Sequence, residues 1–278
     1  MPAFATLGDR MKFYEENSPR NYLMPLLPAI VRLDGRSFHS FTAARCVKPF
    51  DAHLAGAMQK AMRELMLETS AVCGYWQSDE ISLVLYTGDT KSLIYFDGRV
   101  DKINSVLAAR CARTFNASYT GGDTSARKSE ADFDCRCFNL PTSGEVYNYL
   151  LWREQDATRN SIQGAGQFYF SPTQMHKLNT KQVQEKLFQE RQVNWNDYPT
   201  AFKRGMYACK VKRTGTVSEA ERLLLPPKHR ALTDPNFVYE RSVIELTCLP
   251  PIARIANPYD VIFEGADPTV ITTEQESQ

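Results

Sequence analysis

Strand-like and helical segments alternate in one order over the first half of this chain, and that order limits the possible folds. Runs of branched and aromatic apolar residues predict strands, and apolar residues at every third or fourth position predict helices. The expected elements are a strand at 28–34, a helix at 51–70, two strands within 71–88, a helix at 100–119 and a strand at 131–141. This order is that of the ferredoxin-like unit, so the sequence predicts an α+β fold. Nucleotide-polymerase palms and nucleotide cyclases share the arrangement.

The pattern becomes more helical after residue 141. Residues 142–145, Thr-Ser-Gly-Glu, have the spacing of a capping box ahead of a long helical pattern. Further elements are expected as a helix over 180–191 with Thr180 as its N-cap, strands near 204–213 and 242–250, and a short helix near 7–16. We therefore expect a palm-like catalytic domain over 1–140, additional helices and a strand that complete the site over 141–223, and a C-terminal extension over 224–278.

Composition excludes several classes of protein. The formal net charge is +1, so contacts with a polyanion must come from a local basic patch. No apolar run reaches the roughly 20 residues that a membrane span needs, and the N-terminal residues are too polar for a secretory signal. The seven cysteines include no CxxC pair. This favours a reducing cytoplasm over a disulfide framework or a zinc site.

Carboxylates stand at two strand ends that this fold brings together. Asp34 and Gly35 end the first strand, and Asp79 and Glu80 lie at the turn between the second and third strands. The first strand of a ferredoxin-like sheet pairs antiparallel with the third, so the two ends are neighbours. Carboxylates this close raise each other's pKa, and Mg²⁺ relieves the conflict because it prefers carboxylate and phosphate oxygens. The pattern indicates a pair of divalent ions suited to displacement at phosphorus.

A simpler interpretation exists for each of these residues. Asp-Gly is a common turn pair, and Asp79 alone is compatible with a plain hairpin turn. The polar cluster at 77–80 between two apolar strands favours a site instead. Basic residues that could neutralise triphosphate oxygens are Arg36, Lys48, Lys203 and Arg204. Each of them taken singly is typical of a solvated surface, and a lone His39 is typical of a packed or capping histidine.

Several motifs in one order resemble the histidine tRNA guanylyltransferase superfamily, the 3′–5′ polymerases that add nucleotides to the 5′ end of tRNA. The two that carry the carboxylates are RLDGRSFHSF at 32–41 and QSDEIS at 77–82. The others are LGDRMKFYE at 7–15, KPFD at 48–51, FDCR at 133–136, YLLWREQD at 149–156 and a basic-basic-glycine step at 203–205. The resemblance covers roughly residues 6 to 212.

The resemblance implies a palm-like domain with two Mg²⁺ ions, ATP and GTP or other nucleoside triphosphates as substrates, tRNA as a partner, and a homotetramer. It implies that Asp34, Asp79 and the Gly35 carbonyl hold the metal ions. The expected catalytic set is Asp34, Asp79 and Glu80, in which Glu80 shapes the site without being a direct ligand. The nucleotide-binding residues it implies are Arg36, Ser37, Phe38, His39, Lys48, Ser78, Lys203 and Arg204.

Contacts with the RNA are expected from local basic and polar residues, mostly to phosphates. The expected RNA-binding residues are Arg153, Asn160, Lys210, Lys212 and Arg213, with Arg127 and Lys128 as further basic candidates. Lys210 and Lys212 alternate along a strand and should share one face. A solvated sheet face and a solvated loop are the alternative interpretations.

One motif departs from the pattern of the superfamily. Eukaryotic guanylyltransferases carry His-Ile-Asn-Asn after WRxxD, whereas residues 158–161 here read Thr-Arg-Asn-Ser. Thr158 therefore replaces the histidine that is tied to non-templated guanylate addition, and the chain is more similar to the bacterial and archaeal branch. This favours templated repair of tRNA 5′ ends over strict addition to histidine tRNA.

Two other classes of protein stay open as alternatives. A nucleotide cyclase would use the same palm, but its GG[DE]EF hairpin is absent. A non-catalytic RNA-binding protein would keep the fold alone, but Asp34, Asp79 and Lys48 are all present.

Overall fold

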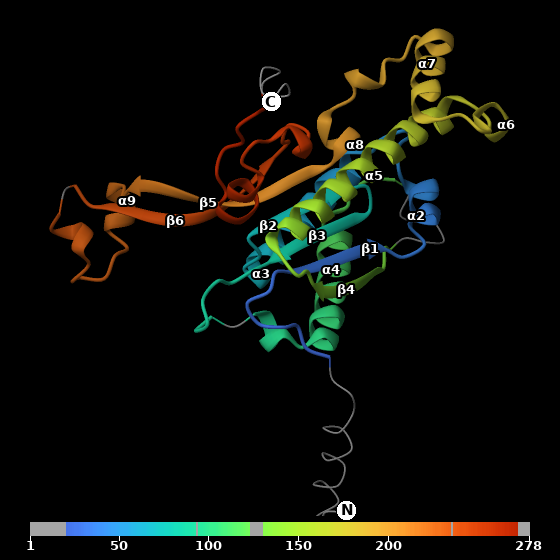
Figure 1. Ribbon diagram of the computed structural model, residues 1–278. Helices are drawn as coiled ribbons and strands as arrows, with labels where there is room; N and C mark the ends of the chain where they lie inside the picture. Colours follow the sequence, from blue (N-terminus) through green and yellow to red (C-terminus); the bar gives the residue numbers. More distant parts are fainter. Residues whose placement is uncertain (1–20, 93, 123–129, 235, 272–278) are drawn as a thin grey trace, which may run out of the picture.

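A six-stranded antiparallel sheet in the order β4-β1-β3-β2-β5-β6 organises the chain (Figure 1). The computed structural model describes residues 21–92, 94–122, 130–234 and 236–271. The expected helix near 7–16 and the candidates Arg127 and Lys128 lie outside them. The strands are β1 (Ala29–Gly35), β2 (Cys73–Gln77), β3 (Glu80–Leu85), β4 (Phe133–Asn139), β5 (Met206–Thr216) and β6 (Val238–Thr247).

The first four strands confirm the predicted fold. Helix α3 (Ala52–Thr69) joins β1 to β2, and α4 (Val100–Ser118) joins β3 to β4, which gives the expected order. β1 pairs antiparallel with β3, as the ferredoxin-like arrangement requires. β5 then extends the sheet beside β2, and β6 pairs with β5, so the sheet includes strands from all three expected regions of the chain.

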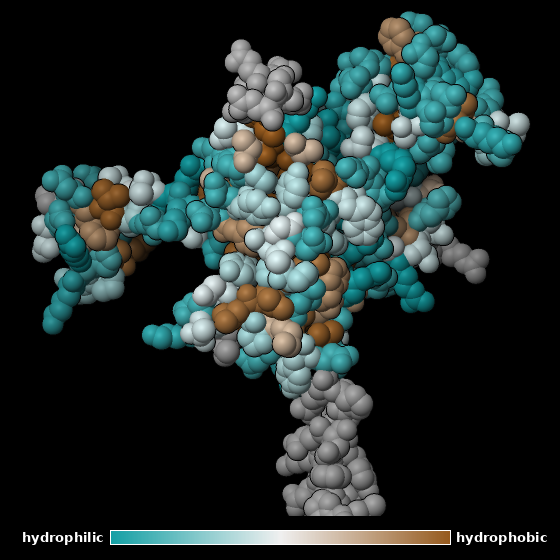
Figure 2. Space-filling view, in the orientation of Figure 1, coloured by the Kyte–Doolittle hydropathy of each residue, from teal (hydrophilic) through white to brown (hydrophobic). Residues whose placement is uncertain are grey.

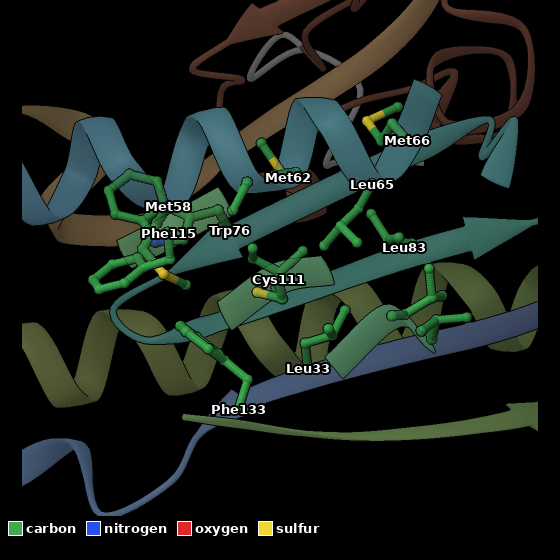
Figure 3. Packing of buried hydrophobic residues seen from close by; sticks show 14 of the residues in the cluster. Leu33, Met58, Met62, Leu65, Met66, Trp76, Leu83, Cys111, Phe115 and Phe133 are labelled. Carbon is green, nitrogen blue, oxygen red and sulfur yellow. The ribbon is translucent and has the colours of Figure 1, made fainter. Parts of the chain in front are cut away.

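One face of the sheet packs against α3 and α4. Alternate residues of β1 point toward these helices, and α3 directs Met58, Met62 and Leu65 at the strands (Figure 3). These side chains are fully buried, because apolar residues at helical spacing form a continuous stripe along α3. Asp51 caps the helix and accepts a hydrogen bond from the Leu54 N–H at 2.7 Å. Its position at the N-cap fixes the loop that precedes α3.

The other face packs against α5 (Ser143–Tyr169) and the C-terminal segment, which contains the short helical turns η4 (Ile252–Arg254) and η5 (Asp260–Glu264). Thr142 is the N-cap of α5, as its spacing predicted, and its hydroxyl accepts from the Glu145 N–H at 3.2 Å. The face is apolar where the C-terminal segment covers it and polar near the β2–β3 turn. This polar end is where the candidate site lies.

The remaining elements lie around these layers. They are α2 (Phe38–Arg45), η1 (Tyr95–Gly98), α6 (Pro172–Met175), α7 (Thr180–Arg191), η2 (Trp195–Asp197), α8 (Thr200–Arg204), α9 (Glu219–Arg222) and η3 (Arg230–Leu232). The expected helix over 180–191 is present, but Asn179 and not Thr180 is its N-cap. The Asn179 side chain accepts from the Gln182 N–H, and the Gln182 side chain accepts from the Asn179 N–H.

Strands β5 and β6 form a long two-stranded ribbon that extends away from the body of the molecule (Figure 1). Hydrophobic residues gather at its far end (Figure 2), and the residues of that end include Leu223 and Leu224, which are 88% and 86% exposed. In the part of the chain that the structure describes, no helix combines the length and the hydropathy needed to cross a bilayer.

A glycine at the end of β1 makes room for a buried aromatic ring, and this generates a prediction. A Cβ at Gly35 would lie 2.2 Å from the Phe38 ring. Phe38 packs against Phe41, Phe115 and Phe133 and cannot retreat. We expect Gly35→Ala to lower the free energy of unfolding by about 1–3 kcal/mol in denaturant titrations.

Gly56→Ala is the matched control for this substitution. Gly56 lies in α3 and a Cβ there would meet nothing within 4 Å, so we expect a gain of up to about 1 kcal/mol from helix propensity. Unfolding of Gly35→Ala at the wild-type midpoint would contradict the steric argument.

Candidate active site

The two predicted strand ends meet in the structure. Asp34 lies opposite Glu80 in the β1–β3 register, and the Gly35 N–H donates to the Asp79 carbonyl oxygen at 3.1 Å. The turn between β2 and β3 places Ser78 in the left-handed region at φ 51°, and the Trp76 indole donates to the Ser78 carbonyl oxygen at 2.8 Å. The predicted convergence of Asp34 and Asp79 is therefore confirmed.

The electrostatics of Asp79 are those of a carboxylate without a counter-charge. Burial and the neighbouring charge of Asp34 raise its pKa to about 6, although hydrogen bonds from the Asp79 and Ser78 groups act in the opposite direction. Burial disfavours the charged carboxylate, and a like charge nearby adds to this cost. A bound cation would remove both penalties.

The donors at this site fit Mg²⁺. Asp34 and Asp79 offer two carboxylates, and Gly35 lies between them with its carbonyl at the end of β1. Mg²⁺ commonly takes one or two carboxylates and completes its shell with water and substrate phosphates. Among the described residues no group of three or more His, Cys, Asp or Glu could hold a metal ion, so a cage built from protein side chains alone is not found there.

Glu80 does not share this role, because arginines already neutralise it. Its two carboxylate oxygens accept from Arg153 Nε and Nη2, both at 2.7 Å, and Arg32 Nη2 lies 2.7 Å from Oε2. Gln77 and Ser82 add weaker hydrogen bonds at 3.3 and 3.4 Å. Glu80 is 2% exposed. It therefore shapes the site from within the core, and the expectation that it belongs to the catalytic set is corrected to a positioning role.

Arg153 was expected to contact RNA, and the structure gives it a different role. It is 4% exposed, and its guanidinium also pairs with Asp156 at 2.9 Å. A buried guanidinium with two carboxylate partners is not available to a phosphate. Arg32 was missed in the sequence, although it lies two residues before Asp34 and so on the same face of β1.

A cavity of about 220 Å³ opens beside Ser78. Lys48 and Asn160 are among the residues that line it, and Phe50 forms part of its wall and stacks on Phe202 with ring centroids 5.1 Å apart. Asp51 orders the Lys48 loop, since its second oxygen accepts from the Val47 N–H at 2.7 Å. The structure thus brings Lys48, Ser78 and Asn160 together, next to the carboxylate pair.

Other predicted nucleotide-binding residues divide into two groups. Phe38 is 3% exposed, so its ring belongs to the aromatic core and is not available to a nucleotide, and nucleotide binding at Phe38 stays a prediction that concerns its backbone. Arg36, Ser37 and His39 are exposed at the start of α2, where Ser37 is the N-cap. These three stay predictions, and their place just after Gly35 is compatible with contact to phosphates.

The two residues of the basic pair also differ. Lys203 is buried, and its ammonium donates to the Asn196 carbonyl oxygen at 2.5 Å and lies over the Trp195 ring. This contact corrects the expectation that Lys203 binds nucleotide. Arg204 has a buried Nε for which the described residues provide no hydrogen-bond partner. Arg204 is therefore the better candidate of the pair for a triphosphate.

The predicted RNA-binding residues on β5 lie on the ribbon. Lys212 pairs with Glu240 at 3.5 Å, and Arg213 forms two hydrogen bonds with Glu245 at 2.7 and 2.6 Å. Asn160 is elsewhere, at the cavity, and its amide donates to Asp156 at 3.2 Å. The prediction of RNA contacts by Lys210, Lys212, Arg213 and Asn160 stays a prediction.

Comparison with known proteins gives consistent similarities. A family model described as tRNAHis guanylyltransferase matches residues 8–141. A bacterial tRNA(His) guanylyltransferase (Thg1)-like protein solved in complex with ATP is 39% identical, with 74% of this chain and 89% of that chain covered and a TM-score of 0.68. The corresponding complex with GTP is 33% identical, with 89% and 94% covered and a TM-score of 0.67. The probable tRNA(His) guanylyltransferase of Dictyostelium discoideum is 29% identical, with 70% of this chain and 82% of that protein covered.

The raised pKa of Asp79 predicts a stability effect in metal-free protein. An aspartate in the unfolded chain has a pKa near 4, so stability falls as the pH rises through the folded pKa of about 6. Asp79→Asn removes the charge and should stabilise the metal-free protein by about 2 kcal/mol at pH above about 7. The gain should vanish below about pH 4 in thermal unfolding, where the wild-type carboxyl is protonated in both states.

Addition of Mg²⁺ provides the matched comparison. The ion should raise the melting temperature of the wild type more than that of Asp79→Asn, because the variant lacks one carboxylate ligand. Equal stability of the two proteins at high pH would contradict the proposed charge conflict.

The buried position of Arg153 predicts a structural defect. Arg153→Ala leaves Glu80 buried with one arginine fewer, which should cost about 3–5 kcal/mol of unfolding free energy. Arg159→Ala is the control, since Arg159 pairs with the same Asp156 but is exposed, and we expect a change below about 1 kcal/mol. A stable Arg153→Ala protein with weaker RNA binding would restore the original expectation.

Proposed function

The chain belongs to the tRNA(His) guanylyltransferase family, whose members are nucleotidyltransferases, and from this premise we propose that it extends the 5′ end of tRNA in the 3′–5′ direction by templated repair. The observation that carries the proposal is the convergence of Asp34 and Asp79 beside a cavity lined by Lys48 and Ser78. Asp79, whose pKa is raised, and Asp34, whose one ion pair with Arg32 is long at 3.7 Å, lie next to cationic and hydroxyl groups, an arrangement suited to a metal-bound triphosphate.

Activation of the RNA end is the first step that we propose. An oxygen of the 5′-monophosphate attacks the α-phosphorus of ATP, which releases pyrophosphate and leaves an adenylylated 5′ end. The 3′-hydroxyl of an incoming nucleoside triphosphate, usually GTP, then attacks the 5′-phosphorus, forms the phosphodiester bond and releases AMP. A 5′-triphosphate end enters at the second step and releases pyrophosphate.

The residues of this chain position the reactants and balance their charge. Asp34, Asp79 and the Gly35 carbonyl would hold two Mg²⁺ ions, which when bound lower the pKa of the attacking hydroxyl and stabilise the leaving group. Lys48, Ser78 and Arg204 would contact the triphosphate, because Lys48 and Ser78 line the cavity and Arg204 has an unsatisfied Nε among the described residues. The reaction needs no side-chain nucleophile.

Thr158 supports templated repair over strict addition to histidine tRNA. Its hydroxyl donates to the Glu154 carbonyl oxygen of its own helix at 2.9 Å, so the side chain is engaged with the backbone. The neighbouring Arg159 pairs with Asp156. The chain therefore offers no imidazole at the position that the superfamily links to non-templated addition. Strict guanylate addition is the second candidate, since the curated relative named above carries that name.

Three further features belong to the proposal. The carboxylate pair and the family resemblance support two Mg²⁺ ions, the resemblance alone supports a homotetramer, and the seven cysteines without a CxxC pair favour a cytoplasmic location.

The test uses full-length protein, Mg²⁺, ATP, labelled nucleoside triphosphates and a tRNA that lacks its 5′ nucleotide. The base opposite the gap is varied, and the 5′ end of the product is sequenced. We expect the added nucleotide to pair with the opposing base, and we expect no addition by Asp34→Asn because one metal ligand is lost. Addition of G alone, to histidine tRNA alone, would favour the second candidate, and no addition by the wild type would overturn the proposal.

A further inference from the structure

An exposed tryptophan lies next to Arg153, the arginine that pairs with Glu80, and has no part in the site described so far. Trp152 is in α5 and is 51% exposed. The Arg153 guanidinium lies over its ring, 4.4 Å from the centroid, and the Tyr149 ring meets it edge-on at 5.9 Å. Half of the side chain stays exposed despite these two contacts, so part of the indole is accessible to a planar group.

The orientation of α5 places Trp152 on the β4 side of the sheet. Tyr149 contacts Phe138 of β4 with ring centroids 6.0 Å apart. On the other flank of the helix, Glu154 accepts hydrogen bonds from Tyr207 of β5 at 3.1 Å and from the Ile252 N–H at 3.1 Å. β4 is at the edge of the sheet, and its side chains Asp134 and Arg136 on this face are 55% and 54% exposed.

The sheet at this edge carries charged side chains in two rows. Asp134 of β4 lies opposite Asp34, and Arg136 lies opposite Arg32. Arg136 is 54% exposed and pairs with Asp134 at 3.1 Å. Arg32 has a buried Nε for which the described residues provide no partner. We call Trp152, Arg136 and Arg32 the β4 shelf.

The β4 shelf and the cavity adjoin the carboxylate pair from different directions. The shelf reaches the pair through Asp34, which is the β1 neighbour of Asp134, whereas the cavity reaches it through Ser78 in the β2–β3 turn. In-line displacement at phosphorus needs the nucleophile and the leaving group on opposite sides of the reacting atom. The two places therefore suit two different substrates.

We propose that the β4 shelf binds the 5′-terminal nucleotide of the RNA, with Trp152 stacking on its base and Arg136 pairing with its phosphate, while the nucleoside triphosphate enters through the cavity. The inference rests on the proposed function and deepens it by assigning the RNA end to one side of the site. Stacking on an aromatic ring suits this task, because every base has a π-face and the repair reaction must accept different terminal bases. The exposed, singly paired guanidinium of Arg136 suits a terminal phosphate.

Tryptophan fluorescence reports on the shelf without any need for catalysis. The chain has three tryptophans, and Trp76 and Trp195 are only 2% and 6% exposed. A tRNA that lacks its 5′ nucleotide and carries a 5′-monophosphate should therefore quench Trp152 on binding. GTP alone should not quench Trp152, because the proposal places the nucleoside triphosphate in the cavity.

Substitutions then separate stacking from folding. Trp152→Ala should raise the Kd for this tRNA about tenfold with the KM for GTP unchanged, and Trp152→Phe should recover most of the affinity. Arg136→Ala should remove the preference for a 5′-phosphate over a 5′-hydroxyl end. Phe188→Ala, at an exposed aromatic of α7, is the control and should bind as the wild type does.

The outcomes distinguish this inference from the function on which it rests. If Trp152→Ala binds this tRNA with wild-type affinity and adds nucleotides normally, the inference that the β4 shelf binds the RNA end is wrong. The proposed function would be unaffected. Quenching of Trp152 by GTP, with a raised KM for GTP in the variant, would assign the shelf to the triphosphate and overturn the inference. A wild type that neither binds tRNA nor extends it would overturn both.

Discussion

The buried carboxylate of Glu80 is the interaction on which the rest of the site depends. Arg32 reaches it from β1 and Arg153 reaches it from α5, so one side chain joins two strands and a helix. A buried ion pair is costly to desolvate, and hydrogen bonds from Gln77 and Ser82 to the Glu80 carboxylate offset part of this cost. Since Asp79 is the preceding residue, the docking of α5 also fixes the turn that carries the metal-binding candidate.

The partition of charge explains what the site can accept. Three carboxylates gather at the ends of β1 and β3, but the arginines neutralise Glu80 and leave Asp79 with a raised pKa. The single contact of Asp34 with Arg32 is long, at 3.7 Å. The core thus neutralises Glu80 with two arginines, and Asp34 and Asp79 stay the proposed ligands of a cation.

The sequence predicted what depends on strand order and failed where packing decides. The convergence of Asp34 and Asp79 follows from antiparallel pairing of the first and third strands, which the spacing of apolar runs made visible. The burial of Arg153 follows from the face that α5 turns toward the sheet, and an arginine in a polar motif does not reveal that face. The burial of the Phe38 ring was missed for the same reason, because its motif lies at a strand end while its ring enters the aromatic core. At the start of α7, Asn179 and Thr180 both have capping side chains, and only the backbone geometry selects Asn179.

The C-terminal region is part of the catalytic framework, although it lies beyond the residues matched by the family model. The Glu154 carboxylate accepts from the Ile252 N–H and from Tyr207, and the buried Tyr75 ring packs against Tyr207 and donates its hydroxyl to the Arg204 carbonyl oxygen. Two adjacent residues of α5 therefore contact different parts of the structure. Arg153 pairs with Glu80 at the β2–β3 turn, and Glu154 accepts a hydrogen bond from the C-terminal segment. Loss of the segment after Pro251 would leave a buried, charged Glu154 with fewer donors, and the penalty would fall on the helix that positions Asp79.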